Sequence, residues 1–235
     1  MARKRKSTAR AWAWRAAALL VLAGALWAGW QWWAMQDWRP SEETYPDQGV
    51  ELSDRSGQVR YPTLAALGAR FAYVAASEGE GGRDPSFARH LRGARGAGLR
   101  VGAVHRFDPC VRADGQSANF SRVVPRDADL LPPVIALDRT AQDCPERVSD
   151  AAVESELLTL VNQIELHAGR PAILKISERF EQEYGLAGAL ERDLWLVRNR
   201  FAPDYAGRPW LLWTANRSLK TEASEEPLEW VVVRR

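Results

Sequence analysis

Residues that commonly bind transition metals are scarce in this sequence, which has two cysteines and three histidines among 235 residues. His90, His105 and His167 are scattered along the chain and show no zinc-like spacing with the cysteines. The glycine-rich stretch 79–82 is not followed by the Lys-Ser/Thr pair of a phosphate-binding loop. The chain has no internal repeat and no low-complexity tract beyond residue 48. We therefore expect no metal site and no cofactor.

Net charge is also small, at +2, and it is unevenly distributed. Residues 1–15 hold six of the 32 Lys and Arg residues and no acid, so the remainder carries 26 basic and 30 acidic residues, a net charge of −4. A mildly acidic body does not neutralise a phosphate backbone, so we expect no nucleic-acid partner. The composition is otherwise that of a globular protein, with 46% hydrophobic and 26% charged residues.

A long run without charge extends from Ala16 to Gln36 and ends at Asp37. As a helix, its 21 residues would measure roughly 31 Å, about the thickness of a bilayer hydrocarbon core. Tryptophans, which favour the membrane interface, gather near both ends: Trp12, Trp14, Trp27, Trp30, Trp32, Trp33 and Trp38. The basic cluster 3–6 is expected to stay in the cytoplasm. We predict a single-pass anchor in a bacterial inner membrane, with a cytoplasmic N-terminus and a periplasmic domain.

A cleaved signal peptide is the alternative, because the small residues 23–25 follow a short apolar stretch. The uncleaved anchor is favoured because the apolar run continues past that site to full spanning length. Both interpretations export the domain. With an anchor, the chain divides into a basic tail at 1–15, a span at 16–36, a polar, proline-containing linker at 37–48 and a domain at 49–235.

The two cysteines fit an exported domain. In an oxidising compartment, Cys110 and Cys144 can form one disulfide. They follow neighbouring predicted strands, so their loops are expected to lie together near the site. Two unpaired thiols are the alternative, and the sequence leaves both open.

Beyond residue 48, apolar stretches of strand length alternate with helical patterns. Strands are predicted at 49–52, 71–76, 99–107, 132–138, 172–176, 194–197, 210–213 and 228–233. Helices are predicted at 62–67, 85–97, 117–124 and 148–167. Continuous apolar strands alternating with helices indicate a parallel sheet covered on both faces. Eight strands in about 190 residues predict an α/β fold, an irregular (β/α) TIM-like barrel.

Chemistry in such barrels lies at the C-terminal ends of the strands, so polar residues there are candidate site residues. The positions are held by Glu51, Glu78, His105, Asp138 and Glu229. Converging carboxylates would repel one another in a structural core. A glycoside hydrolase, in contrast, requires a carboxyl pair, one to protonate the leaving oxygen and one to stabilise or attack the anomeric carbon. Lys175, inside an apolar strand, is either a partner of a site carboxylate or a snorkelling side chain.

Seven stretches, taken in order, resemble the family 25 glycoside hydrolases, the lysozymes of the Chalaropsis type. They are 48–53 (QGVELS), 71–79 (FAYVAASEG), 84–87 (DPSF), 94–99 (ARGAGL), 102–107 (GAVHRF), 116–120 (QSANF) and 131–138 (LPPVIALD). Each alone is a weak signal, but the ordered set covers most of the exported domain. The resemblance implies an irregular barrel of five β/α units and three further strands. It also implies hydrolysis of the β-1,4 bond after N-acetylmuramic acid in peptidoglycan.

The departures from the family pattern fall on its catalytic positions. The opening Asp is Glu51, and in the D-x-E stretch the first acid is Ala136 while the proton donor is Asp138. The Asp of the last strand has Glu229 as a loose counterpart. Asp138 retracts the carboxyl by one methylene, and Glu51 extends far enough to rebuild the pair. Glu78 and His105 are retained, although a buried histidine is more often a packed core residue than an acid or base.

Three interpretations follow. The first is an active membrane-anchored muramidase with Asp138 as the acid, Glu51 as its partner and Glu229 in the catalytic set. Glu78 and His105 would bind substrate, while Tyr73 and Trp213 would stack on sugar faces. The second is a degenerate member that binds peptidoglycan glycan strands without cutting them and scaffolds cell-wall enzyme complexes. The third is a hydrolase of a different glycan or a different fold.

Overall fold

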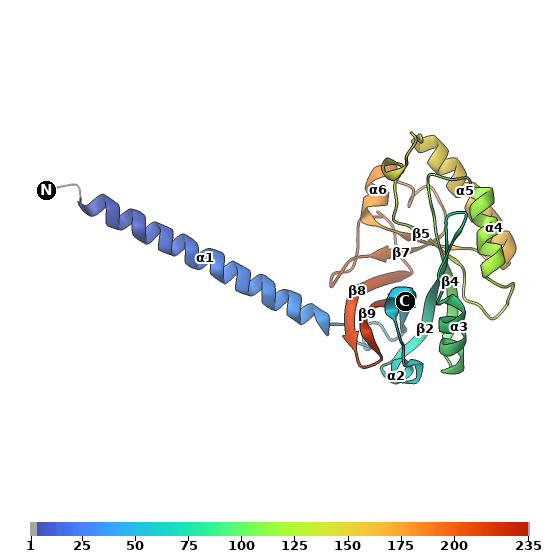
Figure 1. Ribbon diagram of the computed structural model, residues 1–235, viewed down its shortest axis with the longest axis horizontal. Coiled ribbons are helices and arrows are strands. Elements are labelled where there is room, and N and C mark those ends of the chain that lie inside the picture. The colour runs from blue at the N-terminus through green and yellow to red at the C-terminus, as the bar shows by residue number, and fades with distance from the viewer. Residues whose placement is uncertain (1–3, 235) are drawn as a thin grey trace. The chain divides into compact units, whose positions relative to one another are not determined.

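The computed structural model describes residues 4–234, so Arg3 of the basic cluster and the C-terminal Arg235 lie outside the described residues. The chain forms two compact units that meet in sequence between Trp38 and Arg39. The first unit contains helix α1 (Lys4–Gln36), and the second contains all the strands and the other helices (Figure 1).

Helix α1 is one uninterrupted helix of 33 residues. Its part Arg10–Gln36 is long and apolar enough to cross a membrane, a test that a signal sequence near an N-terminus also passes. Its tryptophans and leucines are exposed to solvent within this unit. The helix begins before the predicted span because the basic residues that precede the span are good helix formers.

The second unit is built on a closed barrel of eight strands. These are β1 (Gln48–Leu52), β2 (Ala69–Glu78), β4 (Arg100–Arg106), β5 (Val134–Leu137), β6 (Ile173–Ile176), β7 (Asp193–Val197), β8 (Leu212–Thr221) and β9 (Ser224–Val233). The order β1-β9-β8-β7-β6-β5-β4-β2 closes through the pairing of β1 with β2. A two-residue strand, β3 (Gly82–Arg83), adds to the edge of β2.

All eight predicted strands have counterparts in the barrel, but the prediction of a wholly parallel sheet is wrong. The pairings from β1 through β2 and β4 to β8 are parallel, whereas β9 is antiparallel to both β8 and β1. The last two strands form a hairpin at Thr221–Ser224, too short for the helical crossover that a parallel pair needs.

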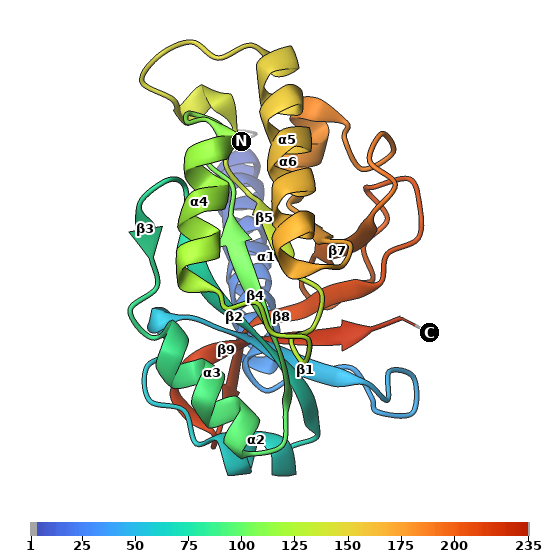
Figure 2. The same ribbon diagram turned by 90° about the vertical axis from the view of Figure 1, so that its right-hand side faces the viewer.

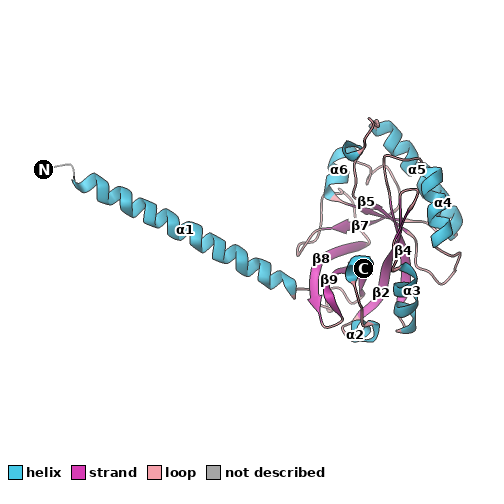
Figure 3. Ribbon diagram, in the orientation of Figure 1, coloured by secondary structure: helices cyan, strands magenta, loops and turns pink. Residues whose placement is uncertain are grey.

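Helices lie outside the parallel part of the barrel (Figures 2 and 3). They are α2 (Tyr61–Ala66), α3 (Phe87–Gly96), α4 (Ala113–Val123), α5 (Asp150–Ala168) and α6 (Glu178–Tyr184), with short 3₁₀ turns η1 (Asp54–Ser56) and η2 (Ala141–Asp143). The side chain of Ser149 caps α5, and Gly169 ends it in the left-handed conformation. Helix α6, which the sequence analysis missed, has the same signals in Ser177 and Gly185.

No helix follows β8 or β9 in the described chain, and residues 39–47 pack near these strands instead. Gln48 Nε2 donates to the carbonyl oxygens of Pro40 (3.1 Å) and Tyr45 (2.8 Å). The Tyr45 ring contacts Trp210 and Trp213, at centroid distances of 6.4 and 5.7 Å. Pro40 and the end of the predicted linker, Tyr45 to Gln48, therefore pack on the domain, whereas Ser41 to Thr44 are exposed.

The lower part of the barrel interior is filled with apolar side chains. This core comprises Phe71, Tyr73, Val104, Val134, Ala136, Ile173, Trp195, Leu212 and Val231. Gly49 and Gly102 make room for it, because a Cβ there would collide with the rings of Phe71 and Tyr73. Strand side chains that point inward recur every second residue, so the next inward positions towards the mouth form a new layer. Glu51, Lys175 and Glu229 occupy such positions.

Candidate active site

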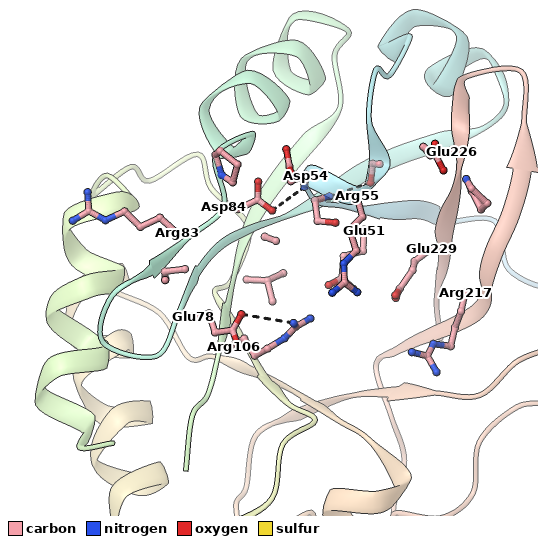
Figure 4. A pocket seen from close by; sticks show the side chains of 18 of the residues that line it. Glu51, Asp54, Arg55, Glu78, Arg83, Asp84, Arg106, Arg217, Glu226 and Glu229 are labelled. Atoms are coloured by element: carbon pink, nitrogen blue, oxygen red, sulfur yellow. Dashed lines mark hydrogen bonds and ion pairs between the residues drawn. The ribbon is translucent and has the colours of Figure 1, made fainter. Parts of the chain in front are cut away.

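A cavity of about 780 Å³ opens at the C-terminal ends of the parallel strands. Its wall is rich in charged side chains (Figure 4): Glu51, Asp54, Arg55, Glu78, Arg83, Asp84, Arg106, Arg217, Glu226 and Glu229. Three of the predicted catalytic or binding residues, Glu51, Glu78 and Glu229, therefore line one cavity. Both acidic and basic groups line it, a composition suited to a polar ligand.

Glu51 and Glu229 lie directly opposite each other in the antiparallel pairing of β1 and β9. The ammonium group of Lys175, from β6 across the barrel, donates to a carboxylate oxygen of each, at 3.1 Å for Glu229. Lys175 also lies over the Trp195 ring, with Nζ 4.8 Å from the ring centroid. Its side chain is only 13% exposed. Of the two interpretations of Lys175, the structure supports the buried partner of site carboxylates.

The two carboxyl groups differ in their affinity for a proton. Burial raises the pKa of Glu51 above its ordinary value, although the charge of Lys175 opposes the rise. Burial also acts to raise the pKa of Glu229, but the charge and hydrogen bond of Lys175, with Arg217 and Arg106, outweigh it and lower that pKa. Burial alone would lower the pKa of Lys175, but the two carboxylates raise it, so the ammonium remains charged.

Asp138 lies apart from this pair and is held by an arginine that the sequence analysis did not single out. Arg106 Nε is 3.2 Å from Asp138 Oδ2, and Arg106 Nη1 is 3.8 Å from Glu78 Oε2. Arg139 Nη1 contacts Glu78 at 3.5 Å and Asp108 at 3.2 Å. Asp138 is largely exposed and is absent from the cavity wall, whereas Arg106 lines it. Arg106 therefore links Asp138 to the cavity wall.

His105 belongs to strand β4, but its side chain lies on the outer side of the barrel and has a structural role. It is fully buried, with Nδ1 2.8 Å from Ser77 Oγ and Nε2 3.3 Å from Gln116 Oε1. The Gln116 amide donates to the carbonyl oxygens of Asp108 and Val111, so its Oε1 must accept and His105 Nε2 carries the proton. Burial lowers the pKa of His105 to about 4, which keeps the ring neutral. The expectation that it binds substrate is corrected.

The two aromatic residues predicted to stack on sugars are also buried. Tyr73 is 3% exposed within the interior core, where its ring lies 5.2 Å from that of Trp195. Trp213, also 3% exposed, lies on the outer side of β8, and its indole N–H donates to Arg198 O. Neither lines the cavity. Both assignments are corrected: alternation along β8 turns Leu212 and Thr214, not Trp213, towards the interior.

Cys110 and Cys144 form a disulfide, with their Cα atoms 5.3 Å apart. The bond joins the connection after β4 to the connection after β5, as the alternative with a disulfide predicted. Asp108, which contacts Arg139, also accepts a hydrogen bond from the backbone N–H of Cys110 at 3.0 Å. The disulfide thus stabilises the loops that carry the charged groups beside Glu78.

Comparisons with known proteins agree on the fold. The chain is 24% identical over 196 residues to the protein YegX of Escherichia coli K12, described as uncharacterized, covering 80% of this chain and 70% of that protein. A family 25 glycosyl hydrolase from Bacillus anthracis superposes with a TM-score of 0.75 and 25% identity, covering 84% and 92% of the two chains. A bacterial lysozyme from Streptomyces coelicolor gives 0.71 and 17%, covering 80% and 92%.

The sequence model described as Glycosyl hydrolases family 25 matches residues 50–218, most of the barrel domain. This range includes all of the predicted motifs except the residues that begin the first one and contains Glu51, Glu78, Asp138 and Lys175. The chain belongs to the glycosyl hydrolases of family 25.

Proposed function

We propose that this protein hydrolyses the β-1,4 bond after N-acetylmuramic acid in peptidoglycan, with Glu51 and Glu229 as the carboxyl pair. The observation that carries the proposal is their shared position: both line the cavity from adjacent strands, and their pKa values are displaced in opposite directions. In such a pair, one carboxyl group can be protonated while the other is ionised at the same pH, as glycoside hydrolysis requires. Family membership supports the choice of substrate.

In the proposed reaction, protonated Glu51 donates its proton to the glycosidic oxygen as the bond from that oxygen to the anomeric carbon breaks. The ionised Glu229 stabilises the positive charge that develops on the sugar ring, or attacks the anomeric carbon. Water then supplies the hydroxyl group of the new reducing end, and its proton returns to Glu51. Lys175 holds both carboxylates through one nitrogen atom, so the two groups are close enough for the short separation of a retaining pair.

This assignment moves the proton donor from Asp138, the donor expected from the family pattern, to Glu51. The Asp138 carboxylate is paired with Arg106 and does not line the cavity, whereas Glu51 does. Glu51 is the carboxyl group that burial drives towards the neutral form. Asp138 then has a positioning role, through the orientation of Arg106.

The test is the release of reducing ends from purified peptidoglycan by the full chain in detergent. We expect Glu51→Gln and Glu229→Gln to lower the rate by about 10²- to 10⁴-fold, the contribution of a general acid or its partner. Glu226→Gln is the matched control, because Glu226 lines the same cavity outside the pair. Asp138→Asn and Glu226→Gln should stay within about tenfold of the unmodified protein. Loss of activity in Asp138→Asn with activity retained in Glu51→Gln would restore Asp138 as the donor.

We also propose that α1 anchors the protein in a bacterial inner membrane, with its N-terminus in the cytoplasm and the barrel in the periplasm. The length and composition of Arg10–Gln36 and the preceding basic residues support this placement. N-terminal sequencing of the protein from the membrane fraction tests it. An intact N-terminus is expected, whereas a new N-terminus near Ala25 would identify a cleaved signal peptide.

A second candidate function is binding of peptidoglycan glycan strands without hydrolysis. It is favoured by Ala136, which leaves a methyl group where the family pattern has an acid, and by Lys175, which already engages both remaining carboxylates. Saturable binding to sacculi with no new reducing ends, in the same assay, would select this function.

A further inference from the structure

Phe201 is the one exposed aromatic side chain among the described residues 39–234, with 68% of its surface accessible. It lies in the connection between β7 and β8, two residues after Asn199, which lines the cavity. The rings of Tyr73 and Trp213 are buried, whereas the ring of Phe201 is open to a ligand in solution.

The backbone beside Phe201 is strained. Arg200 has φ = 69°, the one positive φ at a non-glycine residue within the described part of the chain. This conformation costs free energy for a residue with a side chain, and such strain is concentrated at functional sites. Two hydrogen bonds maintain it, from Arg200 N to Ala215 O and from Phe201 N to Asn199 O, both at 2.8 Å.

The connection that carries the ring is fastened to the barrel. Tyr205 OH donates to Ile176 O at 2.7 Å and accepts from Val197 N at 2.8 Å. Arg198 and Asp204 form an ion pair at 2.7 Å. A large apolar ring is therefore displayed to solvent on a fixed loop, and a fixed ring loses little entropy when it binds a ligand.

Polar groups accompany the ring. The backbone N–H of Arg217 donates to Asn199 Oδ1 at 2.9 Å, which joins the β7–β8 connection to the middle of β8. The side chains of Asn199 and Arg217 both line the cavity, and Figure 4 shows Arg217 beside Glu229. An exposed aromatic ring two residues from the Asn199 amide, with the Arg217 guanidinium in the same cavity wall, suits a sugar ring, which has apolar C–H faces and polar substituents at its edge.

We propose that Phe201, with Asn199 and Arg217, forms a subsite that stacks on a pyranose ring of the glycan strand next to the cleavage cavity. The nature of the ligand rests on the proposed function, but binding at this subsite requires no hydrolysis. A glycan is favoured over a protein or a lipid surface because Asn199, two residues before Phe201, and Arg217, which is bonded to Asn199, both belong to the cavity wall.

Binding of the full chain in detergent to purified sacculi, measured as Kd by sedimentation, tests the subsite. Phe201→Ala should raise Kd by about three- to tenfold, the effect expected for loss of an aromatic contact. Phe201→Leu, which keeps an apolar side chain without a π face, should show most of this loss, while Phe201→Trp should bind like the unmodified protein. Leu166→Ala is the control, because Leu166 is 81% exposed on α5, away from the cavity wall.

Reducing-end release, measured in parallel, separates this inference from the proposed function. In Phe201→Ala, a higher KM with an unchanged kcat supports both. If the unmodified protein releases no reducing ends but Phe201→Ala still binds sacculi more weakly, the subsite is supported and the proposed hydrolase activity is rejected. The subsite would be overturned if Phe201→Ala had the same Kd and KM as the unmodified protein. It would also be overturned if Phe201→Ala and Leu166→Ala lost the same amount of affinity for sacculi.

Discussion

Ala136 and Lys175 are neighbours across the parallel pairing of β5 and β6, at an inward-facing level of the barrel. The strand that carries an alanine at this level is therefore next to a strand that supplies a buried ammonium group. The ammonium group of Lys175 donates its hydrogen bonds to Glu51 and Glu229.

This relationship predicts the effect of Ala136→Asp. The new carboxylate would lie within reach of Lys175 and would add negative charge near the sugar ring as it becomes positive. We expect reducing-end release to rise by about tenfold, in the range of electrostatic contributions to catalysis. Ala136→Asn, of equal size and without charge, is the control. An equal rise in the Asn variant, or a fall in the Asp variant, would contradict the role of charge.

Lys175→Met removes the ammonium group that donates to both Glu51 and Glu229. Two buried carboxylates would then face each other, and breaking a buried ion pair costs about 3–5 kcal/mol. Chemical denaturation at pH 7 should show a loss of this size. The loss should shrink towards pH 4, because protonation of the carboxylates removes their repulsion. Lys175→Arg keeps the charge, and a loss independent of pH in the Met variant would point to packing alone.

His105 should make stability depend on pH. Its pKa is lowered to about 4 in the folded protein from an ordinary value of 6.5, so the unfolded chain binds a proton between these values and the folded protein does not. Stability is therefore fully present above pH 6.5 and falls with decreasing pH, by up to about 1.4 kcal/mol per pH unit, until about pH 4. His105→Gln should flatten this dependence in denaturation curves collected at each pH. A slope that survives the substitution would assign the effect to other groups.

The disulfide should contribute about 3–4 kcal/mol to stability, the value expected for closing a loop of this length. Cys110→Ser should lower the free energy of unfolding by this amount under oxidising conditions. A reductant should destabilise the unmodified protein equally and leave the Ser variant unchanged. Two titratable thiols in the denatured, unreduced protein would refute the bond.

The barrel strands could be predicted because each is an apolar run bounded by polar or glycine residues. The second half of β8 could not, because Arg217 and Ser218 are exposed and break the apolar pattern. Helix α6 was missed because seven residues give too little periodicity, even though Ser177 and Gly185 mark its ends.

The positions of Glu51 and Glu78 at the cavity could be predicted from their places near the ends of β1 and β2, but the partners of the carboxylates could not. Lys175 comes from a strand that is not adjacent to β1 or β9, and only closure of the barrel brings its ammonium group to Glu51 and Glu229. Side chains along β8 alternate between the interior and the outer face, so a shift of one residue reverses the direction of Trp213. In a strand with Leu212 and Trp213 both apolar, sequence does not reveal which one points inward.

The pairing of β1 with β9 has a consequence for biosynthesis. Glu51 belongs to the first strand of the domain to be synthesised, and Glu229 belongs to the last. Until residues 224–233 arrive, β1 has no partner on one edge and the proposed carboxyl pair does not exist. A nascent or prematurely terminated chain therefore has no assembled site, and any power to cut the wall arises only when synthesis of the barrel is finished.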